Sequence, residues 1–548
     1  MAVVEFSVSD LESLVGRKLT KDELSEKIPM MGFPLEKLEN GKAFFEVFPN
    51  RPDMLSVEGF ARSIRNFLGI GKDPAYNFKK GSIKLVVDKS VKQVRPYAVA
   101  AAVRNIRLTD ELLISLMQVQ EKLHDTLGRK RRKVAIGIHD LGKVKPPFVY
   151  KAVPPAEISF VPLDMDKKLS LAEICKIHPK GVKYAHILSS YGKWPVIIDK
   201  RGEVLSFPPI INGDLTRVTE NTKSIFIDVT GTDLKAVNQA LNILTALFHE
   251  RGCHVEKVII VDGRKMVTPD TSPMIIKLDI NYASRLLGVQ LSTPKARKLL
   301  SMMGISLGKN AAVPYYRTDI LHQMDLVEEL AIAYGYHNFN PELPSISTIA
   351  CRDESAEISE SVREAMIGQC FQETVGMVLT NEEDEFAKMN RPKEEVCETA
   401  NPLSVECTIC RKNIIPSLLR VLAQNKNREY PQKIFEIGFV VIPSQSSETG
   451  AHNYLKLACA ISDVKAGYED ISPVLDALMR SFKISYKLKK TEHPSFSPGR
   501  AAWIEISGKP VGIIGEVNPE AIEKWKIEKP VAAFELDVSD IRKILKGS

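Results

Sequence analysis

Residues 316–336 have the sequence YRTDILHQMDLVEELAIAYGY, in which four carboxylates lie among residues with the pattern of a packed helix. The carboxylates are Asp319, Asp325, Glu328 and Glu329. The last three are spaced at i, i+3 and i+4, so one helix face gathers them, and Asp319 lies six residues upstream of Asp325. This crowding predicts either a bound cation or the weaker attraction of acids to the positive end of a helix, worth ~0.3–1 kcal/mol for each acid.

Length and composition indicate a soluble protein of several domains. A chain of 548 residues is too long for a single hydrophobic core and predicts roughly three to five domains. No apolar run has the length that a bilayer requires. The eight cysteines are scattered, so we expect a cytoplasmic protein with reduced thiols. The CxxC pair, Cys407 and Cys410, lacks a second pair at zinc-finger spacing, which favours incidental cysteines over structural zinc.

Changes of pattern divide the sequence into four regions. Residues 1–84 alternate short strands and helices and end in a linker, and residues 85–268 have the pattern of a larger α/β unit. Residues 269–346 combine short strands, two short helices joined by a turn, and the carboxylate helix. Residues 347–548 begin with a helix and continue as strands separated by Gly and Pro turns. The predicted fold class is therefore α+β and multidomain.

The charge distribution is uneven, although the net charge is a mild +7. A dense basic cluster, RKRRK, occupies residues 129–133. It predicts either a solvated loop or a surface that faces phosphates, which would fix the position of a nucleic acid without recognising its sequence.

Eight segments along the chain occur in the order that one family has. They are FPNRPDMLSVEGFARSIRNFLG, RRKVAIGIHDL, FPPIING, FIDVTGTD, the 316–336 segment, NPLSVECTICRKNIIPSLLRVLAQN, FEIG and HPSFSPGRAA. Through them the chain resembles, nearly end to end, the β subunit of phenylalanine–tRNA ligase in its shorter archaeal and eukaryotic form. The resemblance implies an α/β editing domain of the B3/B4 type at 85–268, a B5-like helical or winged domain at 269–346, and at 347–548 an antiparallel-sheet domain like the catalytic domain of class II synthetases.

The resemblance implies that the carboxylate set binds magnesium. The family's D-x5-D-x2-E-E spacing matches Asp319, Asp325, Glu328 and Glu329 position by position. Magnesium takes oxygen ligands and keeps several waters, so not all four need bind directly. A divalent ion would also relieve the repulsion between the acids.

Catalysis of aminoacylation is not expected from this chain. The family's catalytic subunit has an R-x-E strand and a G-x-G-x-x-R segment, whereas here no G-x-G-x-x-R occurs and the CRDE segment at 351–354 precedes a helix. Without those arginines nothing obvious holds the phosphates of ATP. The resemblance therefore implies that residues 347–548 are inactive and pack against an α subunit that binds ATP, in an α2β2 heterotetramer that charges tRNA(Phe). Arg411 and Arg500 are expected to serve structure or the interface.

The resemblance also implies a hydrolytic activity towards tRNA mischarged with tyrosine. A pocket shaped for phenylalanine rejects an added hydroxyl by only ~10²-fold, so a second site must remove the error. The best candidates for recognising the tyrosine side chain or amino group are Asp228 and Thr230, and Ser206, Pro208 and Asn212 are expected to line the pocket. For Asp228 the alternative is an exposed acid at a strand end that caps the next turn.

Hydrolysis is expected to use a positioned water, because no Ser-His-Asp or Cys-His arrangement is apparent in the sequence. His139, beside Asp140, is a possible general base. A buried, hydrogen-bonded histidine is the favoured interpretation.

Two other classes of function remain open. The first is a nucleic-acid-binding scaffold without activity, suggested by the helix-turn-helix-like region 275–345 and the basic cluster; salt-dependent binding to arbitrary duplex DNA would favour it. The second is a freestanding ester hydrolase acting on aminoacyl-tRNA, which a soluble monomer that edits without binding an α subunit would favour.

Overall fold

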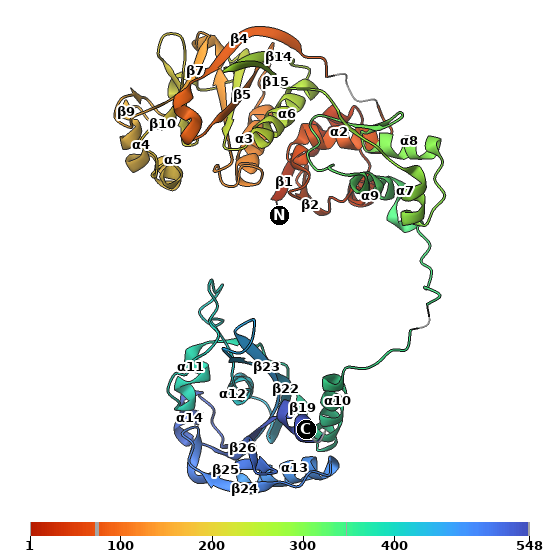
Figure 1. The fold of residues 1–548 in the computed structure, drawn as a ribbon, viewed down its shortest axis with the longest axis vertical. Coiled ribbons are helices and arrows are strands. Elements are labelled where there is room, and N and C mark those ends of the chain that lie inside the picture. Colours follow the sequence, from red (N-terminus) through yellow and green to blue (C-terminus); the bar gives the residue numbers. More distant parts are fainter. Residues whose placement is uncertain (1, 72–75, 347, 546–548) are drawn as a thin grey trace. The chain divides into compact units, whose positions relative to one another are not determined.

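The computed structural model describes residues 2–71, 76–346 and 348–545, and the chain divides into two compact units. The first unit is Met1–Leu343 and the second is Pro344–Ser548 (Figure 1). Of the helices in the described ranges, none is long and apolar enough to cross a bilayer.

The first unit begins with a three-stranded antiparallel sheet in the order β1-β3-β2. Its helix α1 (Val8–Val15) starts where the Ser7 side chain accepts a hydrogen bond from the Asp10 amide, and it ends at Gly16 in the left-handed conformation. The other elements are β1 (Ala2–Ser7), η1 (Glu23–Lys27), η2 (Pro29–Met31), β2 (Leu35–Glu39), β3 (Lys42–Val47), η3 (Pro52–Met54) and α2 (Val57–Phe67).

The middle of the first unit is a ten-stranded mixed sheet with the order β12-β11-β10-β7-β4-β14-β5-β13-β6, in which β15 pairs with β14. The strands are β4 (Lys79–Val87), β5 (Tyr97–Arg104), β6 (Val134–Asp140), β7 (Phe148–Val153), β10 (Trp194–Ile198), β11 (Val204–Phe207), β12 (Ile211–Asn212), β13 (Ser224–Gly231), β14 (His254–Asp262) and β15 (Arg264–Thr268). The helices and smaller elements are η4 (Lys89–Gln93), α3 (Asp110–Asp125), η5 (Leu141–Lys143), β8 (Ser159–Phe160), β9 (Leu169–Ser170), α4 (Leu171–Ile177), α5 (Pro179–Tyr184), η6 (Ala185–Ile187), η7 (Asp214–Thr216) and α6 (Leu234–Glu250).

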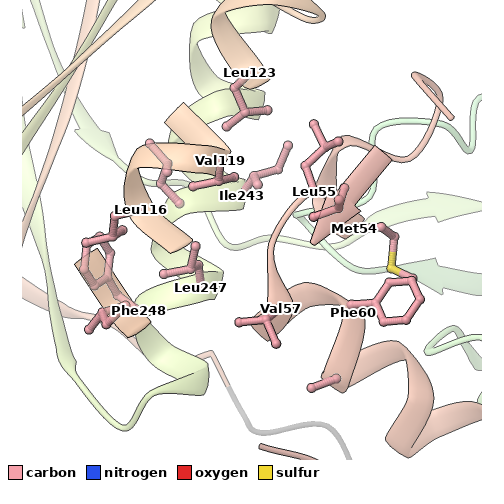
Figure 2. Close-up of a cluster of buried hydrophobic side chains, with 14 of the residues drawn as sticks. Met54, Leu55, Val57, Phe60, Leu116, Val119, Leu123, Ile243, Leu247 and Phe248 are labelled. Carbon is pink, nitrogen blue, oxygen red and sulfur yellow. The ribbon is translucent and has the colours of Figure 1, made fainter. Parts of the chain in front are cut away.

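A continuous hydrophobic core joins the N-terminal segment to this sheet. Helices α3 and α6 contribute Leu116 and Leu247, and the N-terminal segment contributes Leu55 and Phe60 (Figure 2). The apolar stripe of α6 that the sequence predicts is buried against both partners. Residues 2–71 are therefore packed onto the sheet through its helices.

The first unit ends with a small sheet and three helices. The sheet has the order β16-β18-β17. The elements are β16 (Met274–Ile276), α7 (Ile280–Leu287), α8 (Thr293–Met302), β17 (Ser306–Leu307), β18 (Ala311–Val313), α9 (Gln323–Tyr334) and η8 (Tyr336–Asn338). Helix α9 carries the predicted carboxylate face.

The second unit is a seven-stranded sheet with the order β19-β22-β23-β27-β26-β25-β24, in which every neighbouring pair is antiparallel except β19 and β22. The segments FEIGFVV and SPGRAAWIEI lie in β22 and β25, as predicted. The elements are α10 (Glu354–Gly368), β19 (Gln372–Glu373), β20 (Leu379–Thr380), α11 (Glu382–Glu385), η9 (Ala387–Met389), β21 (Ile409–Cys410), α12 (Ile415–Gln424), β22 (Gln432–Pro443), β23 (Ala451–Ser462), α13 (Tyr468–Ser481), β24 (Lys487–Thr491), β25 (Phe496–Ile506), β26 (Lys509–Val517), α14 (Pro519–Lys524), β27 (Val531–Asp537) and α15 (Val538–Leu545).

The two arginines singled out in the second unit differ in their surroundings. Arg411 is buried and pairs with Glu436 at 2.7 Å, so it serves the structure. The Arg500 side chain is 60% exposed, and its guanidinium lies 3.6 Å from Glu516.

Buried charges connect the three parts of the first unit. The Arg62 guanidinium lies 3.6 Å from the ring centroid of Tyr316 and pairs with Asp53 at 3.4 Å. Asp53 also accepts two hydrogen bonds from Arg51, both 2.9 Å long. On the other side of Arg62, Glu250 at the end of α6 lies 3.9 Å away and accepts a hydrogen bond from Arg65. Three segments far apart in sequence thus share one charge network.

The electrostatic balance of Asp53 favours its charged form. Burial opposes ionisation, but Arg51, followed by Arg317 and Arg62, outweighs it and lowers the pKa of Asp53 to about 2. The ordinary aspartate pKa is ~3.9. Because the folded-state pKa is lowered, the contribution of Asp53 to stability is full above pH 4 and is lost as the pH falls towards 2.

We expect Asp53→Asn to destabilise the first unit by ~3–5 kcal/mol at pH 7, because it leaves buried arginines without their counterion. The difference in unfolding midpoint between wild type and variant, measured in urea at several pH values, should shrink as the pH falls from 4 towards 2. Asp22→Asn is the control, since Asp22 and its partner Lys27 are exposed. A difference that stays constant with pH would contradict this account.

Candidate functional site

A cavity of about 310 Å³ lies beside α3 in the first unit, and it gathers four of the five residues predicted for the editing pocket. Its walls come from α3, β6, the 206–218 segment and β13. Asp228, Ser206, Pro208 and Asn212 line it. The volume falls at the lower end of the range of small-molecule sites.

Asp228 is a buried wall of this cavity. It lies within β13 and is 1% exposed, so the alternative of an exposed acid capping a turn is wrong. Its Oδ2 lies 2.7 Å from His139 Nε2, and His139 Nδ1 lies 2.8 Å from Thr216 Oγ1. His139 is fully buried, which confirms the favoured interpretation of that residue. The ring fixes the orientation of the carboxyl group.

A glycine makes room for this pair. Gly137 faces Asp228 across the β6–β13 register. A Cβ atom at residue 137 would lie 2.2 Å from Asp228 Oδ2 and 2.6 Å from His139 Nε2. Both atoms are buried and bound to each other, so neither can move aside without breaking their hydrogen bond.

Two neighbouring strands add polar groups to the cavity. Ser206 on β11 and Asn212 on β12 are opposite each other in the sheet. Ser206 Oγ is buried and has no hydrogen-bond partner among the described residues. An unpaired buried hydroxyl costs ~1–3 kcal/mol, so a ligand that pairs with it gains affinity.

Thr230 does not line the cavity, although the sequence predicted it beside Asp228. Its hydroxyl accepts a 3.1 Å hydrogen bond from Arg95 Nε, and its carbonyl accepts one of 2.8 Å from Arg95 Nη2. Burial lowers the pKa of Arg95 to about 10. Arg95 also donates to the carbonyls of residues 131 and 132, so Thr230 supports the segment that borders the cavity.

Arg131 is a site residue that the sequence interpretation missed. The basic cluster is not a solvated loop throughout, because Arg131 is 5% exposed. Its guanidinium donates to the carbonyls of Pro209 and Ile210 and to Glu121 Oε1 at 2.8 Å. Three consecutive residues with positive φ, Arg129 to Arg131, turn it inward. The dense run of basic residues could have drawn attention to Arg131. The sequence does not show, however, that this turn directs the Arg131 side chain towards the cavity.

The α3 side of the cavity carries charge. His124, with Arg131 and Lys180, lowers the pKa of Glu121 to about 2 and keeps its carboxylate ionised. Burial lowers the pKa of His124 to about 4, so this ring is neutral at pH 7. The cavity therefore has an ion pair, Glu121 with Arg131, on its α3 side and the polar groups of the sheet on another wall.

The carboxylate set on α9 has an arginine partner that the sequence interpretation also missed. Arg317 donates to both oxygens of Asp319, at 2.9 and 2.7 Å, and pairs with Glu329 at 2.9 Å. Asp325 accepts hydrogen bonds from the amides of Leu321 and His322 and so caps the helix. Arg317, two residues before Asp319, therefore supplies part of the positive charge that balances this acidic helix face.

Glu328 is the remaining carboxylate. It makes no hydrogen bond or ion pair with any residue described, and burial followed by Glu329, Asp325 and Asp319 raises its pKa. In the described part of the chain no three Asp, Glu, His or Cys side chains converge as a metal-binding group, and this includes Cys407 and Cys410. Arg317 pairs with two of the four acids, and Arg51 also lies within electrostatic range of Asp319. The negative charge that remains at Glu328 and Asp325 fits a cation held through one or two carboxylates and waters.

The chain matches three domain families in succession. These are the B3/4 domain at residues 115–261, the tRNA synthetase B5 domain at 276–336 and the phenylalanyl-tRNA synthetase β chain CLM domain at 340–538. The 310 Å³ cavity lies within or beside the first match, and the carboxylates lie in the second.

Proteins that align with the whole chain agree with these three domain matches. The chain is 41% identical to a phenylalanine–tRNA ligase β subunit of Pyrococcus abyssi, over 98% of this chain and 99% of the relative. It is 40% identical to that of Methanocaldococcus jannaschii, over 98% and 100%. An N-terminal fragment of the phenylalanyl-tRNA synthetase β subunit from Pyrococcus horikoshii has a similar structure, with a TM-score of 0.59 and 38% identity over 61% of this chain and 99% of the fragment.

We expect Gly137→Ala to displace the Asp228–His139 pair and to destabilise the protein by ~1–3 kcal/mol, as overpacking does. Thermal unfolding measures the effect. Gly192→Ala is the matched control, because a Cβ atom there meets nothing within 4 Å, and it should change stability by less than ~0.5 kcal/mol. Equal unfolding temperatures for the two variants would show that the close approach at residue 137 is not a constraint.

Proposed function

The chain belongs to the family of phenylalanine–tRNA ligase β subunits, and from this premise we propose that it acts with a separate α subunit in charging tRNA(Phe) and itself hydrolyses mischarged Tyr-tRNA(Phe). The family resemblance and the α+β, multidomain fold expected from the sequence are confirmed by the relatives and by the B3/4, B5 and CLM matches. The two finer activities rest on the arguments that follow.

The second unit supports the α-partner role. It lacks the synthetase arginine signatures in its sequence. It also exposes apolar side chains in connections that precede β22, where Val375 and Leu403 are 92% and 104% exposed. An α subunit that covers them in an α2β2 assembly would bury more than ~2,000 Å², as stable obligate interfaces do. ATP is then bound mainly by the α subunit, in the cytoplasm.

The cavity beside α3 carries the editing proposal. A tyrosyl ester differs from a phenylalanyl ester by one hydroxyl, and Asp228 and Ser206 are buried polar groups that such a hydroxyl, or the amino group, can pair with. A phenylalanyl group would leave the Ser206 hydroxyl unpaired, which costs ~1–3 kcal/mol, whereas Asp228 keeps its hydrogen bond to His139. The same polar wall that accepts tyrosine therefore disfavours phenylalanine.

Hydrolysis in this cavity requires a water and a means of holding it. Attack by the water on the ester carbonyl breaks the bond to the ribose oxygen and releases tyrosine and the intact tRNA. Asn212 and the Glu121–Arg131 pair are polar groups near which the ester and the water can be held. His139 is a positioning residue, because its ring binds the Asp228 carboxyl group.

Magnesium binding to the α9 carboxylates is the third part of the proposal. Arg317 already satisfies Asp319 and Glu329. Glu328, with Asp325 beside it on the same helix face, would therefore hold the ion, and waters would complete its shell. The ion would neutralise the acidic face and so stabilise the 276–336 region.

We expect Asp228→Ala to slow deacylation of Tyr-tRNA(Phe) by ~10–100-fold, the equivalent of a lost hydrogen bond to a charged group. Charging with phenylalanine by the α–β complex should stay near wild type, because a different unit of the chain serves it. Thr230→Val should have a smaller effect on deacylation and should lower thermal stability, since Thr230 acts through Arg95. Unchanged deacylation in Asp228→Ala would place the editing site elsewhere.

We expect the unfolding temperature of the wild-type protein to rise with magnesium, because a ligand bound to the folded state stabilises it by ~2.7 kcal/mol at a hundredfold excess over Kd. Glu328→Gln should lose this response while keeping wild-type stability without magnesium. Glu329→Gln is the matched variant, and it should be less stable even without magnesium, because Arg317 loses a partner. A wild-type magnesium response in Glu328→Gln would contradict the site.

A further inference from the structure

A second cavity of the first unit, of about 390 Å³, has no role in the functions proposed above. It lies between the N-terminal half of α6, the connection from β15 to β16 and the 314–321 segment. Its volume is within the range of small-molecule sites.

One wall is a row of polar side chains on α6. Lys235, Asn238, Gln239 and Asn242 follow the i, i+3, i+4, i+7 spacing of a single helix face, on a helix that is otherwise largely buried and apolar. The side chains of Lys235 and Gln239 form no hydrogen bond or ion pair with a residue that the structure describes. The Gln239 amide can therefore both donate to and accept from a ligand.

Asn242 adds an unsatisfied acceptor at the inner end of this row. The side chain is 9% exposed, and its Nδ2 donates to the Tyr315 carbonyl at 3.1 Å. Its Oδ1 is buried without a hydrogen-bond partner among the described residues. The bond to Tyr315 fixes which end of the amide is free, so the unsatisfied acceptor next to the cavity is a buried oxygen that calls for an N–H or O–H donor.

The facing wall is part apolar and part acidic. Met266 and Met274 contribute flexible apolar surface. Asp270 is fixed by the Ser272 amide at 3.0 Å. Arg317 also borders the cavity, but Asp319 and Glu329 already neutralise its charge. Of the described residues that line the cavity, Lys235 and Asp270, at the exposed rim, carry the charges left for a ligand.

We propose that this cavity binds a nucleoside, with the edge of its base on Gln239 and Asn242. Side-chain amides pair with base edges because both offer a donor beside an acceptor. The methionines suit the apolar faces of the ring, Asp270 suits a ribose hydroxyl, and Lys235 suits the attached phosphate. Among the described residues that line the cavity, an inorganic anion would find only Lys235 as a free cation, and a purely apolar ligand would leave the amides unpaired. The nucleoside can come from an unpaired nucleotide of tRNA or from a free nucleotide.

The test uses the full-length chain, titrated separately with AMP and with tRNA(Phe). We expect Gln239→Leu to weaken the binding of one of these probes at least tenfold. Gln118→Leu, an amide on α3 that does not line either cavity, is the matched control and should bind both probes like wild type. Loss of AMP binding identifies a free nucleotide as the source, and loss confined to tRNA identifies an unpaired RNA nucleotide.

Two results overturn the proposal. The first is unchanged binding of both probes in Gln239→Leu. The second is AMP binding that Asp228→Ala abolishes and Gln239→Leu retains, which would place the nucleotide in the 310 Å³ cavity instead. Because the Gln239 side chain forms no hydrogen bond or ion pair with a described residue, we expect Gln239→Leu to keep its thermal stability, and this measurement separates lost binding from lost structure.

Discussion

The burial of Arg62 is the constraint on which the first unit depends. A guanidinium that is 2% exposed must have counterions and an aromatic face close by, because an unpaired buried charge is costly. Asp53 comes from the N-terminal segment, Glu250 from the end of α6 and Tyr316 from the loop before α9. The need to pair the buried Arg62 charge thus holds three segments of the chain in fixed positions.

Helix α6 connects this charge network to the two cavities. Its last turn is held at Glu250, and Arg251 beyond it binds Asp10 and Glu58. Its middle packs against α3 and the sheet whose strand β13 carries Asp228. Its polar row forms the wall of the second cavity. Both cavities therefore depend on elements that the charge network keeps in place.

The elements and several site residues could be predicted from sequence because their signals are local. Apolar periodicity located α6, and four residues of the short segments SFPPIING and FIDVTGTD do meet in one cavity. The partners of Thr230, Arg131 and Asp319 could not be predicted in this way. Arg95 lies 135 residues from Thr230, and the inward turn of Arg131 depends on backbone conformation rather than on charge. Arg317 lies within residues 316–336, beside the acids that it binds. The spacing of these acids is the same whether they pair with this arginine or share a metal ion, so spacing alone could not reveal the ion pair.

The central claim is that this chain edits but does not activate the amino acid, and assays of the isolated chain test it most directly. Pyrophosphate exchange with phenylalanine and ATP is measured beside deacylation of Tyr-tRNA(Phe), before and after addition of the α subunit. The account predicts deacylation and no exchange from the chain alone, with exchange starting when the α subunit is added. Exchange by the isolated chain, or an absence of deacylation in both samples, would contradict it.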